Sequence, residues 1–144
     1  MPEITRQIGI SAVNAAVVTR LKTDANTLAY ATKIFNNVVT GTAMPYIHVT
    51  GYMDRPSAMF ASRDYTPEEV SFQVHVWSSY AGDKEAADIM NLISKALTAT
   101  AITVTGYTNL YKCSLDFADI LIDNTNPAAL VRHGVCRFML HICP

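Results

Sequence analysis

One stretch, from Val70 to Trp77, alternates strictly between apolar side chains and side chains with polar atoms. Its two parities are Val70, Phe72, Val74 and Val76 on one side, and Ser71, Gln73, His75 and Trp77 on the other. Successive side chains of a strand point to opposite faces, so the first set must face a core and the second set must face away from it. The chain therefore folds around a sheet that has one covered face.

Two stretches with helical periodicity can cover that face. Their apolar residues recur at spacings of three and four, as on one side of an α-helix. The first stretch contains Ile10, Val13, Val17 and Leu21, and the second, which begins near Gly82 and Asp83, contains Ala86, Ile89, Met90, Ile93 and Leu97. Asp24 is typical of an N-cap and predicts a further short helical turn that contains Leu28.

Further strands are predicted from short apolar or alternating runs. They are expected at Ile34–Val39, Pro45–Thr50, Tyr111–Ile122 and His133–Ile142. In the last of these, Cys136, Phe138, Leu140 and Ile142 have the core parity, and His133, Val135, Arg137 and His141 have the other. The apolar positions of the strand before it change parity after Phe117, which predicts a β-bulge near Ala118–Asp119.

These elements predict an α+β fold, an antiparallel four- to five-stranded sheet with helices packed on one face. Residues 1–144 are expected to form a single domain, because one core of this size accounts for the whole length. The segment from Asp54 to Pro67 is rich in Pro, Ser and Asp and is predicted to be a long loop between two strands.

The composition indicates that this domain assembles. Charged residues make up only 16% of the chain, against roughly 25% in a typical soluble domain. Part of the surface is therefore expected to be covered by other protein, as in an oligomer. The formal net charge of −1 excludes a strongly basic nucleic-acid binder. No apolar run is long enough to span a membrane, and an odd number of cysteines, Cys113, Cys136 and Cys143, favours a reducing cytoplasm.

Motifs of known chemistry are absent from the sequence, and no cofactor is predicted. Four histidines, His48, His75, His133 and His141, share the parity that points away from the core. They could hold a metal ion, together with Asp116, in a small α+β enzyme or a metal-binding oligomer. Histidines from separate strands are more often solvated or at interfaces, and Asp116 with Asp119 is more often a solvated pair than an acid–base couple.

An interface is therefore the preferred interpretation of the polar face and of the long loop, because aromatic residues and arginine are enriched where proteins meet. The candidate interface residues are Arg55, Met59, Phe60 and Arg63 in the loop, and His75, Trp77, His133 and Arg137 on the sheet. Cys113 and Cys136 are expected to be buried as small hydrophobic side chains.

Three short runs follow one another along the chain, and each occurs once. They are Pro45-Tyr46-Ile47-His48-Val49, Phe72-Gln73-Val74-His75-Val76-Trp77-Ser78, and Arg132-His133-Gly134-Val135-Cys136-Arg137-Phe138. In this order, with a long loop after the first and a helix directly after the second, they resemble the tail-completion or tail-terminator family of long-tailed bacteriophages. The resemblance extends over nearly the whole chain.

This resemblance implies a structural virion protein without catalysis. Such proteins form a ring, usually of six copies, that caps the head-proximal end of the tail tube, ends tube polymerisation and joins the tail to the head. The implied partners are further copies of the chain, the tail tube protein and a head-completion or connector protein, while DNA passes through the lumen without specific binding. The implied location is the tail–head junction of the virion, after assembly in the host cytoplasm. Another ring component of the head–tail neck is the alternative.

Overall fold

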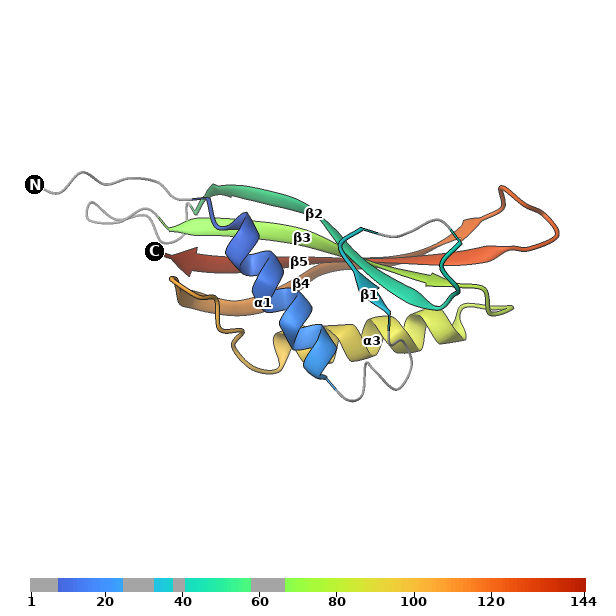
Figure 1. The fold of residues 1–144 in the computed structure, drawn as a ribbon, viewed down its shortest axis with the longest axis horizontal. Helices are drawn as coiled ribbons and strands as arrows, with labels where there is room; N and C mark the ends of the chain where they lie inside the picture. Colours follow the sequence, from blue (N-terminus) through green and yellow to red (C-terminus); the bar gives the residue numbers. More distant parts are fainter. Residues whose placement is uncertain (1–7, 25–32, 38–40, 58–66) are drawn as a thin grey trace, which may run out of the picture.

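The computed structural model describes residues 8–24, 33–37, 41–57 and 67–144 as one sheet with two helices on it (Figure 1). The helices are α1, Ile10–Thr23, and α3, Lys84–Thr98. The strands are β1, Ile34–Phe35; β2, Tyr46–Pro56; β3, Glu68–Ser78; β4, Thr108–Asp123; and β5, Val131–Cys143. The helical turn predicted around Leu28 lies outside the described residues.

The five strands follow the order β1-β2-β3-β5-β4. The pairs β2–β3, β3–β5 and β5–β4 are antiparallel, but β1 runs parallel to β2. The α+β class is as predicted and the described residues form five strands, whereas the prediction of a purely antiparallel sheet is wrong. Periodicity within a strand shows which face is buried but not the direction in which its neighbour runs.

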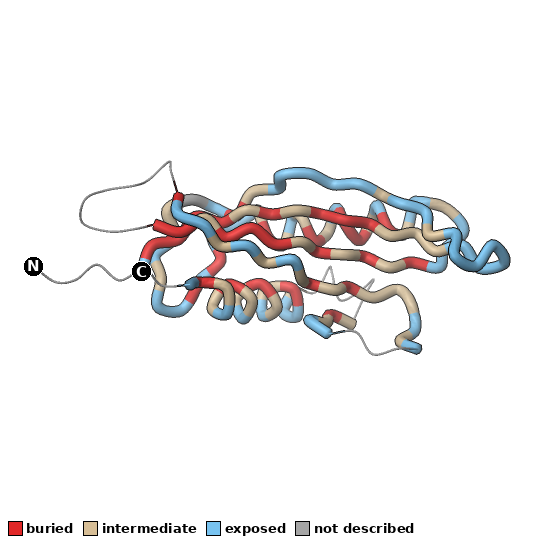
Figure 2. The backbone as a smooth tube through the Cα atoms, turned by 90° about the horizontal axis from the view of Figure 1, so that it is seen from above, coloured by how far each residue is buried: buried red, intermediate tan, exposed pale blue. Residues whose placement is uncertain are grey.

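Both helices pack on the same face of the sheet, which confirms the predicted arrangement (Figures 1 and 2). Most of the core consists of the residues that the strand alternation and the helical spacing predicted to be buried, joined by Ile102 and Val104 from the segment after α3. Its fully buried members include Val13, Val17, Leu21, Val70, Phe72, Val74, Val76, Ile89, Ile93, Leu97, Phe138, Leu140 and Ile142. The rings of Phe72 and Phe138, paired across β3 and β5, stack with centroids 5.6 Å apart. We call the opposite, helix-free side of the sheet the open face.

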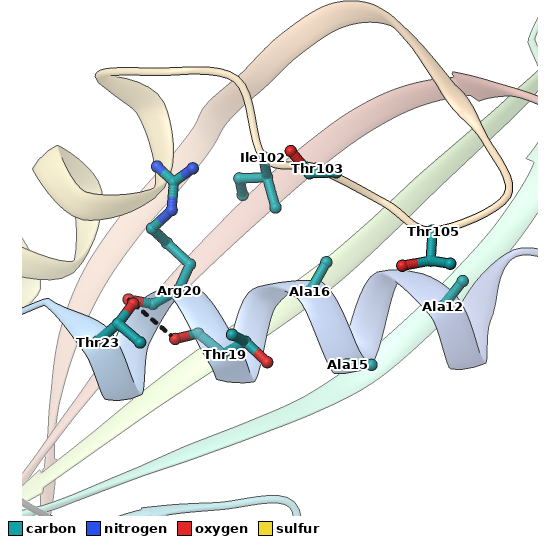
Figure 3. Close-up of a pocket in the computed structure, with 9 residues that line it drawn as sticks. All are labelled: Ala12, Ala15, Ala16, Thr19, Arg20, Thr23, Ile102, Thr103 and Thr105. Carbon is teal, nitrogen blue, oxygen red and sulfur yellow. Dashed lines mark hydrogen bonds between the residues drawn. The ribbon is translucent and has the colours of Figure 1, made fainter.

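Arg20 joins the two helices. Its guanidinium donates hydrogen bonds to the carbonyl oxygens of Ala96 and Ala101, at 3.2 and 2.9 Å, and to the hydroxyl of Thr100 at 2.8 Å. Figure 3 shows Arg20 extending from α1 toward the segment that carries Ile102. A cation at these last carbonyls satisfies acceptors that the end of α3 leaves without helical partners.

Two strand boundaries differ from the prediction. β1 ends at Phe35, and positions 38 and 39 of the expected strand lie outside the described residues. β2 continues through Asp54–Pro56, so the loop predicted to begin at Asp54 begins only at Ser57, whose amide donates to the carbonyl of Pro67 at 2.9 Å. Polar composition alone does not end a strand, because a strand with one solvated face carries polar residues along its whole length.

The β-bulge predicted near Ala118–Asp119 lies slightly earlier in β4. Ala118 and Asp119 pair regularly with β5, and the last register shift of the strand falls between Leu115 and Phe117. This shift explains the change of parity, because Leu115 before it and Ile120 after it both lie on the helix side, opposite Phe138 and Gly134. β4 is also an edge strand, and its apolar residues are exposed on both faces.

All three cysteines are free and buried. Burial raises the pKa of the Cys113 thiol to about 12 and that of Cys136 to about 11. The prediction that these two side chains act as small hydrophobic residues is confirmed. Neither described helix is long and apolar enough to cross a membrane.

Candidate interaction surfaces

A row of aromatic rings crosses the open face near one end of the sheet. Register places Tyr46 of β2 beside Trp77 of β3, and Trp77 beside His133 of β5. The rings of Trp77 and His133 stack with nearly parallel planes, at 8°, and centroids 3.9 Å apart, and Tyr46 stacks on the other side of Trp77 at 6.3 Å. Cross-strand contacts of this kind hold flat side chains in fixed positions on the sheet. The predicted interface residues Trp77 and His133 therefore form one surface.

His75 connects this row to the next. Its Nδ1 lies 2.6 Å from Nε2 of His133, and its Nε2 lies 3.1 Å from Oε1 of Gln73. Because a carbonyl oxygen only accepts, Nε2 of His75 donates to Gln73, and in the neutral ring Nδ1 then accepts from Nε2 of His133. His48 lies beside His75, with ring centroids 6.0 Å apart, and its Nε2 donates to the carbonyl of Asn36 at 2.9 Å. A neutral His75 satisfies both of its contacts.

The environment favours the neutral form of these rings. Burial first, and then the neighbouring His133 and His48, lowers the pKa of His75 from 6.5 to about 4. Burial also lowers the pKa of His133, against the opposing effect of Asp123. The row is therefore an uncharged aromatic surface at neutral pH, with polar ring edges.

The four histidines of the metal-site hypothesis do not form one cluster. His48, His75 and His133 come together, but His141 lies eight residues further along β5, buried, with its Nδ1 3.0 Å from the hydroxyl of Ser57. The nitrogens of His75 and His133 are 2.6 Å apart, whereas two imidazoles on one tetrahedral zinc hold their nitrogens about 3.3 Å apart. Among the residues that the structure describes, no three His, Cys, Asp or Glu side chains are placed to hold a metal ion.

The predicted arginines have partners within the chain. Arg137, on the open face, lies 3.7 Å from Asp116, and the half-exposed Arg55 lies 2.5 Å from Glu69. Exposed pairs of this type contribute little stability, roughly 0–1 kcal/mol, and they can exchange partners. The other predicted loop residues, Met59, Phe60 and Arg63, lie outside the described residues.

A second surface was missed by the sequence reasoning. Five exposed large apolar residues lie on β4 or in the turn after it, and we call them the β4 apolar edge. They are Leu115, Phe117, Leu121, Ile122 and Leu130, between 42% and 57% exposed. Figure 1 shows the β4–β5 hairpin reaching past the rest of the sheet, at the end opposite the chain termini. The signal in the sequence was the presence of apolar residues at both parities, of which the bulge explains only those on the helix side, because Phe117 and Leu121 face the open side.

A groove runs between this edge and α3. It encloses about 510 Å³, and its apolar lining comes from Ala87 and Met90 on the helix and from Leu115, Ala118 and Ile120 on β4. The helix thus leaves part of the helix side of β4 exposed. Apolar surface is exposed on both faces of this edge strand, which is unusual for a protein that stays monomeric.

Comparison with known proteins identifies the family. A family model described as tail completion protein gp17 matches residues 15–142. The chain belongs to this family. No curated protein sequence matches it significantly. Among 22 matching chains of solved structures is one from the virion of a native gene transfer agent (GTA) particle, with a TM-score of 0.81. That chain is 18% identical, and the alignment covers 96% of the present chain and 100% of the other, so the two share a fold.

As a tail completion protein, the chain is a structural component of the virion, located at the tail. This confirms the family and the location that the three sequence runs predicted. Membership in a structural family also favours assembly over catalysis. Its surfaces are accordingly interpreted below as contacts with other virion proteins.

Proposed function

We propose that this chain caps the head-proximal end of the tail tube as a ring of identical copies, ends tube polymerisation and presents the surface to which the head is joined. The protein performs this role without catalysis and without a bound cofactor. Its partners are further copies of itself, the tail tube protein and a head-completion or connector protein.

The observation that carries this proposal is the β4 apolar edge. An exposed edge strand offers a row of unpaired backbone donors and acceptors, and natural proteins protect such strands with charge, proline or a covering element. β4 carries three aspartates and one lysine, yet Leu121 and Ile122 on the same strand are 50% and 57% exposed. Side chains of this type become stable when another protein chain covers them, which is the condition of a subunit in an assembly.

Two further features support a cap. The aromatic row of the open face supplies a second, separate surface, which a ring subunit needs if it contacts both its neighbours and the end of the tube. The net charge of −1 suits a channel through which DNA passes, because retention of DNA increases with the number of Lys and Arg contacts to phosphate.

Deletion of the gene tests the proposal. Heads should still fill with DNA and tails should still start, because neither step uses the cap. A tube end without a cap keeps the surface to which the next tube subunit adds, so growth should continue until subunits run out. We expect overlong tails of uneven length, unattached to heads, in electron micrographs of the lysate.

Complementation provides the control. Purified wild-type chain, and the variant Tyr80→Glu, should restore tails of normal length, because Tyr80 is exposed at 49% but belongs to the segment between β3 and α3 and not to β4. Leu121→Glu should fail to restore them. Tails of normal length joined to heads in the deletion strain would refute the capping role.

A further inference from the structure

The sheet has a second open edge on its other side. β2 pairs outward with β1 only at Ile47 and His48. Beyond that point, from Val49 to Pro56, no described strand lies on the outer side of β2. Eight residues of strand are about 26 Å long, and a β-bulge between Thr50 and Met53 divides them, so ladder hydrogen bonds to a partner would form on either side of the bulge. Within the described part of the chain, the sheet thus has an edge at each end that no further strand covers.

This second edge is also apolar. Met53, on the open face beside Thr50, is 52% exposed, and Ile8, just before α1, is 73% exposed. On the helix side of the same strand, a groove of about 450 Å³ is lined by Ile10 and Asn14 of α1 together with Val49, Thr50 and Tyr52. With Tyr80, these two residues are the only large apolar side chains exposed outside the β4 apolar edge among the described residues. Apolar exposure therefore concentrates at the two edges.

The side chains of β4 match both sides of the β2 edge. Register places Phe117 and Leu121 on the open face of β4, and Leu115 opposite the core residue Phe138, on the helix side. A strand added beside β2 would set its open-face residues near Met53 and its helix-side residues over the groove. Addition of a strand to an open sheet edge is a common mode of recognition between proteins, in which backbone hydrogen bonds provide affinity and side chains provide specificity.

We infer that the β4 edge of one copy pairs with the β2 edge of the next copy, so that the sheet continues from subunit to subunit. The inference rests on the proposed function in that it names the contact by which the capping subunits join to one another. It commits to a head-to-tail contact between two different surfaces of the same chain. Such contacts generate a closed ring when the rotation between copies closes.

Charge favours this pairing over pairing of two identical edges. β4 carries Asp116, Asp119 and Asp123 against one lysine, Lys112. Two β4 strands side by side would bring like charges together, which destabilises a strand pair. The outer part of β2 carries one acidic and one basic residue, Asp54 and Arg55, so it does not repel β4.

Two single variants and their mixture test the inference. Leu121→Glu blocks the β4 edge, and Met53→Glu blocks the β2 edge; both side chains are half exposed, so circular dichroism and the urea midpoint should remain those of the wild type. By light scattering, the wild type should have a multiple of the 15.8 kDa chain mass, and each variant alone should have the mass of one chain. Tyr80→Glu, at matched exposure, should behave as the wild type.

The mixture is the decisive measurement. Each variant keeps one intact edge, so an equimolar mixture, well above the concentration at which the wild type associates, should form a species of twice 15.8 kDa and nothing larger. No growth is possible beyond it, because the two remaining edges are both blocked. If instead Met53→Glu still dimerises alone and the mixture contains no mixed species, identical edges pair and the inference is wrong. A wild type that is monomeric at every soluble concentration, or variants that keep the wild-type mass, would also overturn it.

These outcomes separate the inference from the capping role. If copies join through β4 and β2 but the assembly does not stop tube growth, the proposed function fails and the contact remains. If the chain stops tube growth while the mixture shows identical edges pairing, the contact fails and the function remains.

Discussion

Phe72 offers the sharpest test of how the sheet and the helices hold together. Its side chain is fully buried on the helix side of β3, between the rings of Tyr52 at 5.7 Å and Phe138 at 5.6 Å. Substitution by alanine removes the ring and leaves a cavity between partners that are themselves held by β2 and β5. Neighbouring strands of a sheet cannot collapse into such a space without loss of ladder hydrogen bonds.

The expected cost follows from this burial. Phe→Ala in a core costs about 3–5 kcal/mol, the sum of lost transfer free energy and cavity formation. Each aromatic pair contributes roughly 0.5–1.5 kcal/mol beyond burial, and Phe72 loses two of them. We therefore expect a loss of about 4–5 kcal/mol in the free energy of unfolding, a large part of the roughly 5–15 kcal/mol that holds a domain folded.

Urea unfolding followed by circular dichroism measures the loss, at one fixed protomer concentration and again after dilution, so that assembly does not enter the comparison. Phe117→Ala is the matched control. It removes the same ring from a site that is 45% exposed, and should cost less than about 1 kcal/mol. The double variant Phe72→Ala/Phe138→Ala should lose less than the sum of the single variants, by about 0.5–1.5 kcal/mol, because the two rings touch.

Equal losses for Phe72→Ala and Phe117→Ala would refute the reasoning, since they would mean that the helix-covered face is no better packed than the outer edge. Strict additivity of the Phe72 and Phe138 variants would show that the stacked pair contributes nothing beyond burial.

Three other predictions concern the open face and its support. In the folded chain the pKa of His75 is about 4, whereas in the unfolded chain it has its usual value of 6.5. Between these two values the unfolded chain binds a proton that the folded chain does not, so the free energy of unfolding should be highest above pH 6.5 and fall as the pH decreases toward 4. The partly exposed ring limits this loss to about 1 kcal/mol, and His75→Gln should remove that part of the pH dependence in urea titrations. Gly134→Ala should destabilise the chain by about 1–3 kcal/mol, because the added Cβ would lie 2.5 Å from the sulfur of Met90; thermal unfolding should show partial recovery in Gly134→Ala/Met90→Ala. Trp77→Ala should keep the fold but give a milder form of the deletion phenotype, with part of the tails overlong in micrographs, and tails all of normal length would show that this ring only faces water.

Local periodicity determined much of this protein. The alternation in β3, the helical stripe from Ala86 to Leu97 and the core parity of β5 each state which side chains are buried, because a strand or helix exposes one face whatever its neighbours are. Burial of Cys113 and Cys136 followed from the same parity. The order of three short runs was enough to indicate the tail-completion family.

Tertiary structure decided the rest, because sheet order and register are contacts between residues distant in sequence. Which strand lies at the edge depends on how the strands are ordered, and only that order makes the apolar residues of β4 an exposed surface. Register decided that His75 and His133 hydrogen-bond to each other while His141 lies far away, although all three have the same parity. The direction of β1 was likewise set by its pairing with β2. Parity is a property of one strand, whereas an edge, a cluster or a groove exists only between strands.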